Sequence, residues 1–355
     1  MTQTREGRAR KLSLFAILCV VLTGGVFAQT VNVGVVTDEA EAVLAVLSKK
    51  RAGQAITDED WRRIFSSEGY VRLKRRERAM GRQFEDEDFK AFALSDELSA
   101  RAETLADTLE RWRRADHARS ARLALAYLPK GARIRAKIYP VVKPRTNSFV
   151  FDIDTDPAIF LYLDPAVGRA RFENTLAHEL HHIGYGTVCP TAQTQAELAR
   201  LPKGAQTALT YARAFGEGFA VLAAAGGPDV HPHAASDPKE RERWDRDAAN
   251  FDADLRKVER FFLDVLADKL SEQQIAETVA PFYGEQGPWY TVGWRMCVTI
   301  EKVLGRRALV AAMCDPRELF ATYNRAAATY NRRSRKPLAL WSPQLIEALR
   351  SARPV

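Results

Sequence analysis

Three histidines and a glutamate lie within residues 178–182, in the stretch 174-NTLAHELHHIGYG-186, whereas the whole chain has only six histidines. On an α-helix, which turns about 100° per residue, His178 and His182 lie about 40° apart on one face. Their imidazoles can therefore converge on one metal ion. This is the H-E-x-x-H pattern, in which two histidines bind zinc and the glutamate, here Glu179, acts as general base.

The pair His178 and His181, three residues apart, is also sterically possible on a helix. It would leave Glu179 far around the helix from the shared site. With His178 and His182 as ligands, Glu179 lies beside the open coordination position. We therefore expect His181 to be an outer-shell or cleft-rim residue.

A catalytic zinc site usually has three protein ligands and keeps a fourth position for water. The best candidate for the third ligand is Glu217 in 215-FGEGFA-220. Its face of the helix is otherwise made of small residues, and glycines flank it, so that this helix can press against the polar surface of another. His231 and His233, in a loop rich in proline and glycine, are the alternative ligands.

The metal-binding helix must be anchored on its other side, where Leu176, Leu180 and Ile183 fall. It follows three stretches with strand character, which are Ala132–Val142, Ser148–Asp152 and Ala158–Leu163. We predict a small mixed sheet before the metal-binding helix.

Helical patterns occupy most of the remaining chain. One capped helix is predicted from residue 57 to 65, and longer helices are predicted over Asp96–Leu128, over Gln206–Ala225 and from Asp237 to about Val265. Shorter ones cover Thr291–Leu304 and Asp315–Tyr323. The order of helices, small sheet and helices predicts a mainly helical α+β fold. No linker forces a division, so residues 29–355 are expected to form one domain, with a helical part over 29–128 and a catalytic part over 129–355.

The N-terminus has the pattern of a secretory signal peptide. Four basic residues within the first eleven precede the apolar run Leu12–Phe27, and small residues suit cleavage after Ala28. The run is short for an uncleaved membrane anchor, which needs about 20 apolar residues. We expect an exported protein, periplasmic or secreted, without stable membrane insertion after cleavage.

Removal of residues 1–28 lowers the formal charge from +8 to +5. No basic block interleaved with aromatic residues suggests nucleic-acid binding. The three remaining cysteines, Cys189, Cys297 and Cys314, allow one disulfide and one free thiol, or three buried thiols.

The chain resembles the gluzincins, zinc peptidases with H-E-x-x-H on one helix and a glutamate ligand on a later one. More narrowly it is similar to a bacterial family of zinc-dependent peptidases known mainly from its motifs. The resemblance rests on four segments, 159-IFLYLDP-165, 174-NTLAHELHH-182, 216-GEGFA-220 and 287-GPWYTVGW-294. It implies one zinc ion held by His178, His182 and Glu217, with Glu179 catalytic. Many gluzincins have an aspartate four residues beyond the glutamate ligand, where this chain has Val221.

Bound zinc would lower the pKa of a coordinated water to about 7, and Glu179 would accept a proton from that water. A hydrogen-bond donor should then stabilise the developing oxyanion. We predict Tyr290 in this role, with Tyr283 and His231 as alternatives. An extended peptide substrate could pair with an edge strand, for which Ala158–Leu163 is a candidate, although its continuous apolarity also fits a buried strand.

Three functions remain open at this stage. The leading one is an exported zinc peptidase acting on peptides or proteins. The others are a zinc hydrolase of a different bond and a non-catalytic, zinc-stabilised binding protein. Glu179 favours hydrolysis, because a structural zinc site needs no general base and typically has four protein ligands.

Overall fold

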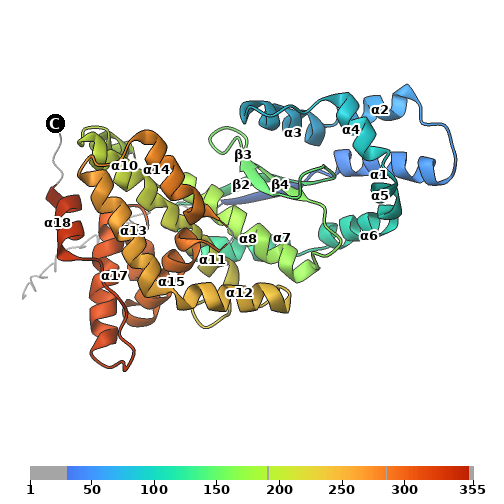
Figure 1. Ribbon diagram of the computed structural model, residues 1–355. Coiled ribbons are helices and arrows are strands. Elements are labelled where there is room, and N and C mark those ends of the chain that lie inside the picture. The colour runs from blue at the N-terminus through green and yellow to red at the C-terminus, as the bar shows by residue number, and fades with distance from the viewer. Residues whose placement is uncertain (1–29, 190–191, 285, 352–355) are drawn as a thin grey trace, which may run out of the picture.

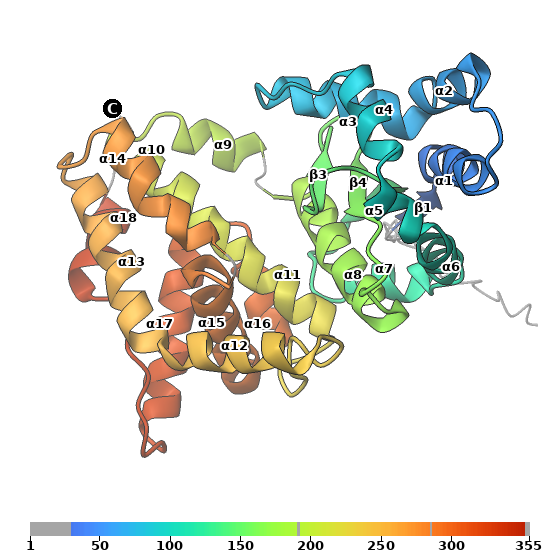
Figure 2. The same cartoon turned by 45° about the vertical axis from the view of Figure 1, so that its right-hand side comes forward.

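The computed structural model describes residues 30–189, 192–284 and 286–351. The predicted signal peptide, residues 1–28, lies outside the described residues. The fold is mainly helical around one four-stranded mixed sheet, which confirms the predicted α+β class (Figure 1). Helices from the N-terminal part lie at one end of the molecule, and most of the C-terminal helices gather at the other (Figures 1 and 2).

The sheet has the order β1-β2-β4-β3. Its strands are β1 (Thr30–Val35), β2 (Arg133–Val141), β3 (Phe149–Phe151) and β4 (Ala158–Tyr162). β2 runs parallel to both β1 and β4, and β3 is antiparallel to β4. The sequence predicted the last three strands and missed β1. Its valines alternate, but its partner β2 is about a hundred residues away in the chain, so only tertiary pairing defines it.

Of the two interpretations of Ala158–Leu163, the buried strand is confirmed and the edge strand is wrong, because β4 lies between β2 and β3. Alternate residues of β2 and β4 point to opposite faces of the sheet and belong to two separate hydrophobic clusters. Ile134, Ile138 and Ile159 belong to the main core on the side of helices α7 (His117–Leu125) and α8 (Arg169–Gly186). The rings of Tyr139 and Phe160 stack with centroids 4.8 Å apart on the other face and pack with Leu73 of helix α3 (Glu68–Ala79). The sheet is thus buried on both faces.

From residue 30 onward, seven helices precede β2. They are α1 (Asp38–Arg51), α2 (Asp58–Phe65), α3 (Glu68–Ala79), α4 (Asp86–Ala93), α5 (Asp96–Ala100), α6 (Ala102–Arg113) and α7 (His117–Leu125). The predicted capping of α2 is confirmed by a capping box between Thr57 and Asp60. The long helix predicted over Asp96–Leu128 was wrong, because three helices share that range. Asp116 caps α7 by accepting a hydrogen bond from the Arg119 backbone at 2.7 Å, which ends the preceding helical run.

After β4 comes α8 (Arg169–Gly186), the helix with the histidine cluster. It is followed by α9 (Ala192–Leu198), α10 (Lys203–Ala212), the 3-10 turn η1 (Arg213–Phe215) and α11 (Gly216–Ala225). The single helix predicted over Gln206–Ala225 is therefore interrupted. The interruption ends at Phe215, whose ring packs 4.9 Å from Trp289 and 5.8 Å from Phe320 in the core. The 3-10 turn therefore coincides with the packing of the Phe215 ring into the core.

The C-terminal elements are α12 (Pro238–Ala249), α13 (Phe251–Leu266), α14 (Glu272–Val279), η2 (Ala280–Tyr283), α15 (Pro288–Leu304), α16 (Arg306–Ala311), α17 (Pro316–Asn331) and α18 (Pro343–Ser351). The one long helix expected from Asp237 is two helices, which meet at Asn250. The apolar spacing persists because Trp244 of α12 and Phe251 and Leu255 of α13 are all buried. Only Asn250 separates the two helices, so the apolar spacing alone did not reveal the break.

Cys189 and Cys314 form a disulfide that joins the segment after α8 to the residues before α17, and Cys297 is a buried free thiol. This arrangement is one of the two that the sequence left open. Within the described ranges, no helix is both long and apolar enough to cross a membrane.

Candidate metal centre

Helix α8 presents its histidines from a firmly anchored position. Leu176, Leu180 and Ile183 are at most 1% exposed, as the helical spacing predicted. Gly184 allows close contact with the sheet, because a Cβ there would lie 2.3 Å from Leu128 and 3.2 Å from Ile134. The face with His178 and His182 is left partly exposed.

Helix α11 brings Glu217 to the same place, and its glycines make this possible. A Cβ on Gly218 would lie 2.1 Å from the Trp294 backbone nitrogen and 2.2 Å from the Gly293 carbonyl carbon. α11 and α15 therefore pack backbone to backbone at this point. The glycines that flank Glu217 predicted close packing against another helix, and this is observed at Gly218. The tight contact is with α15, and it fixes the turn that carries Glu217.

The three predicted ligands form a compact triangle. His178 Nε2 lies 3.1 Å from Glu217 Oε2, His182 Nε2 lies 3.2 Å from the same oxygen, and the two Nε2 atoms are 3.1 Å apart. In the described part of the chain, these three residues are the group of histidine, cysteine and acidic side chains whose geometry could hold a metal ion. Two helices thus meet at one point, although Glu217 follows His182 by 35 residues in the sequence.

The triangle fits zinc. Zinc–nitrogen and zinc–oxygen bonds are about 2.0–2.2 Å, and tetrahedral geometry separates such ligand atoms by about 3.3 Å. Edges of 3.1–3.2 Å are close to that separation. Two imidazoles and one carboxylate also form the donor set of one class of catalytic zinc site, which leaves a fourth position open.

Charge complementarity holds the ligands together. Burial alone would lower the pKa of His182, but the Glu217 carboxylate overrides it and raises that pKa to about 9. Burial would likewise raise the pKa of Glu217, but the two imidazoles hold it well below its usual range. Each group therefore stabilises the charge of the other at neutral pH.

Glu179 and Tyr290 lie close to the triangle, and Tyr290 lines the adjoining cleft. Glu179 is half-buried, and its charge acts on both His182 and Tyr290. The Tyr290 ring lies nearly parallel to that of His178, with centroids 6.4 Å apart. Burial, followed by the carboxylates of Glu217 and Glu179, raises the pKa of Tyr290, so its hydroxyl keeps its proton at neutral pH. The structure thus brings Tyr290 to the ligands, in the first turn of α15.

The structure corrects the cleft-rim placement of His181. This residue is 1% exposed and faces the interior, where neither ring nitrogen has a hydrogen-bond partner within the described residues. Burial lowers its pKa to about 3, which makes it a neutral core residue.

His231 and His233, the alternative ligands, do not join the triangle. His231 Nε2 lies 3.0 Å from Asp245 Oδ1, and the ring faces a neighbouring pocket. His233 Nδ1 forms a hydrogen bond with Ser236 Oγ, and its ring packs against Trp244. His233 also lines the same cleft as His178. Tyr283, half exposed, lines that cleft too.

A cleft of about 320 Å³ opens beside the triangle. One wall of the cleft is formed by the face of α8 that carries Arg171, Asn174 and Thr175. These three residues were not predicted from the sequence as part of the site. Their positions, seven, four and three residues before His178, are the signal that could have identified them. Val221 and Ala224 of α11 form part of another wall. Val221 thus faces the cleft at the position where many gluzincins have an aspartate.

Comparison with known proteins gives one family. The family model described as "Putative zinc dependent peptidase (DUF5700)" matches residues 38–332. No curated protein and no solved structure gives a significant match. The matched range contains both helices that supply the triangle and the helix that carries Tyr290.

Proposed function

The chain belongs to the DUF5700 family of putative zinc-dependent peptidases, and on that premise we propose that it is a gluzincin-type peptidase with one zinc ion per chain. The observation that carries the proposal is the convergence of His178 and His182 from α8 with Glu217 from α11. A cleft of about 320 Å³, lined by His178 and Tyr290, gives a substrate access to this site. A purely structural zinc site is typically closed by four protein ligands.

His178, His182 and Glu217 would hold the metal. Zinc, when bound there, supplies a Lewis acid that lowers the pKa of water and polarises a substrate carbonyl. Glu179 would accept the proton of the attacking water and deliver it to the leaving amine. The Tyr290 hydroxyl, protonated at neutral pH, would donate a hydrogen bond to the oxyanion.

The walls of the cleft suit a peptide. Asn174 and Thr175 offer side-chain hydrogen bonds to a peptide backbone, and Val221 and Ala224 leave room for a side chain near the metal-binding residues. If substrate also pairs with the sheet, the available edge on the β4 side is β3, because β4 itself is enclosed.

We further propose that the mature protein is exported, with residues 1–28 removed and residues 29–355 folded as one unit. The Cys189–Cys314 disulfide supports an oxidising compartment, since disulfides seldom persist in the cytosol. One continuous core cluster runs from Ala40 of α1 to Leu349 of α18, which supports a single domain.

The proposal is tested by metal analysis of the purified mature protein together with a peptide-library cleavage screen. We expect about one zinc per chain and cleavage that a chelator abolishes and zinc restores. Stoichiometric zinc without cleavage of any library peptide would instead favour the zinc-stabilised binding protein. A protein that purifies without metal and takes up none would contradict both functions.

A further inference from the structure

A second pocket, of about 380 Å³, adjoins the metal cleft on the side of α7. It lies between α7, the first turns of α8, the end of α11 and the loop that follows α11. Asn174, Ala224 and Pro232 line both this pocket and the cleft. The two spaces thus meet at these three residues, and a ligand longer than the cleft can extend into the pocket.

The lining of this pocket is mainly small and apolar. It includes Leu123 of α7, Ala170 of α8, Ala225 of α11, and Val230 and Ala235 of the loop. An apolar cavity of about 150 Å³ can hold a benzene molecule, so this larger pocket can take one large aliphatic or aromatic side chain.

The polar groups around the pocket already have partners. Glu173, only 8% exposed, accepts a hydrogen bond from Arg169 Nε at 2.7 Å and pairs with Arg119 at 3.5 Å. Ser120 Oγ donates a hydrogen bond to the Glu173 backbone carbonyl at 2.9 Å. His231 is held by its contact with α12, described above. An apolar side chain could therefore fill the pocket without leaving these groups unpaired.

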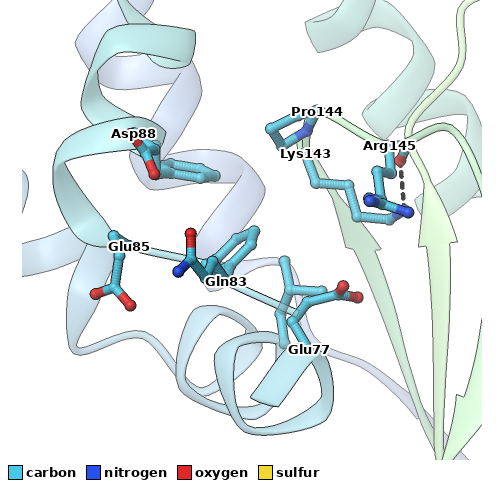
Figure 3. Close-up of a pocket in the computed structure, with 10 residues that line it drawn as sticks. Glu77, Gln83, Glu85, Asp88, Lys143, Pro144 and Arg145 are labelled. Atoms are coloured by element: carbon cyan, nitrogen blue, oxygen red, sulfur yellow. Dashed lines mark hydrogen bonds between the residues drawn. The ribbon is translucent and has the colours of Figure 1, made fainter. Parts of the chain in front are cut away.

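The pocket between α3, α4 and the loop that follows β2 is a contrasting case (Figure 3). Its volume is about 130 Å³, and its buried cation, Lys143, donates hydrogen bonds to the Arg145 carbonyl and, at 2.9 Å, to Asn147 Oδ1. None of the described residues lines both this pocket and the metal cleft. A peptide bound at the metal centre would therefore use the pocket beside α7.

The pocket beside α7 lies at a defined distance from the metal centre along α8. Glu173 and Ala170 precede His178 by five and eight residues. At about 1.5 Å per residue, they lie about 8–12 Å from that ligand along the helix axis. An extended peptide advances about 3.3 Å per residue. A peptide that follows α8 would thus place a residue roughly two to four positions from the cleaved bond in the pocket.

We propose, resting on the peptidase function above, that this pocket determines substrate specificity. It binds a large aliphatic or aromatic side chain roughly two to four residues from the cleaved bond. The substrates are then peptides that carry such a residue at that position, and dipeptides are too short to reach the pocket.

The test uses the zinc-loaded mature protein and a peptide that it cleaves in the library screen. The residues at these positions, on both sides of the cleaved bond, are replaced in turn by leucine, phenylalanine or alanine. At one position we expect kcat/KM to be at least about tenfold higher with leucine or phenylalanine than with alanine, because an apolar pocket discriminates between side chains of different size. The dissociation constants of the same peptides with Glu179→Gln should rank in the same order.

Variants locate the side chain. Ala225→Phe fills the pocket and should lower the leucine-to-alanine ratio severalfold with unchanged zinc content. Its control, Ala328→Phe, lies on the exposed face of α17 and should keep the native ratio. Val230→Asp alters a side chain that is 43% exposed and keeps the test decisive should Ala225→Phe fail to fold. It should also lower the ratio, whereas Val71→Asp, 52% exposed on α3, should not.

Cleavage without a preference at any of these positions would overturn this inference and leave the peptidase function standing. A preference that persists in both Ala225→Phe and Val230→Asp would place the side chain elsewhere and refute it as well. A zinc-loaded protein that cleaves no peptide would overturn the proposed function and this inference together.

Discussion

At the residue scale, the different roles proposed for two glutamates follow from where they lie. Glu217 touches both histidines and has its charge fixed by them. Glu179 lies beside the triangle and outside the group that could hold the ion. A ligand must face the metal, and a general base must face the water that attacks. We therefore expect substitutions at the two positions to separate metal binding from hydrolysis.

For Glu179→Gln, we predict near-normal zinc content and a loss of peptide hydrolysis of about 10²–10⁴-fold, the usual contribution of a general base. Zinc content by elemental analysis and the rate on a library-derived peptide measure the two effects. Glu242→Gln, exposed on α12, is the control and should change neither. Full activity in Glu179→Gln would remove Glu179 from the reaction.

The pair His182 and Glu217 makes the stability of the metal-free protein depend on pH. The pKa of His182 is about 9 in the folded protein and about 6.5 in an unfolded chain, so its contribution is fully present below pH 6.5 and is lost as pH rises through 9. We predict that the chelated protein loses a few degrees of melting temperature between pH 6.5 and 9. The His182→Gln variant should lack this loss, and an identical decline in that variant would contradict the assignment.

At the element scale, the close packing of α11 on α15 positions Glu217. Gly218→Ala should force the two helices apart, destabilise the protein by about 1–3 kcal/mol and lower its zinc affinity. Gly216→Ala is a matched control on the other side of Glu217, because a Cβ there meets no atom within 4 Å. Thermal unfolding and zinc titration compare the two. Equal effects would show that the packing contact does not position the ligand.

The disulfide joins α8 to the C-terminal helices across 125 residues of chain. Cys189→Ser with Cys314→Ser should cost about 2–5 kcal/mol of unfolding free energy, measured by denaturant titration. Adding a reductant to the native protein should give a similar loss. The control variant Cys297→Ala removes the free thiol and keeps the disulfide. A reductant should therefore lower its unfolding free energy by as much as it lowers that of the native chain.

The elements show what local sequence information could and could not predict. The spacing of His178, Glu179 and His182 predicted that the two histidines share one face of a helix, because the angle between helical residues depends only on their separation. The breaks at Asp116 and Asn250 escaped prediction, because an apolar stripe continues across a one-to-three-residue interruption. The interior position of β4 depends on β3 folding back beside it, which the strand's own sequence does not encode. His181 shows the same limit, because its burial depends on the helix packed against it.

At the scale of the whole molecule, the sheet and α7 support α8 from one side while the C-terminal helices deliver α11 and α15 from the other (Figure 2). The metal centre lies where these two sets of helices meet. The family match, over residues 38–332, includes both sets of helices.

The proposed peptidase activity depends on a divalent ion bound by two imidazoles from α8 and one carboxylate from α11. A crystal structure of the zinc-loaded mature protein, with anomalous data at the zinc edge, tests this most directly. We predict one strong anomalous peak at about 2.0–2.2 Å from His178 Nε2, His182 Nε2 and a Glu217 carboxylate oxygen. A peak elsewhere, or one at the histidines with Glu217 turned away, would contradict the central claim.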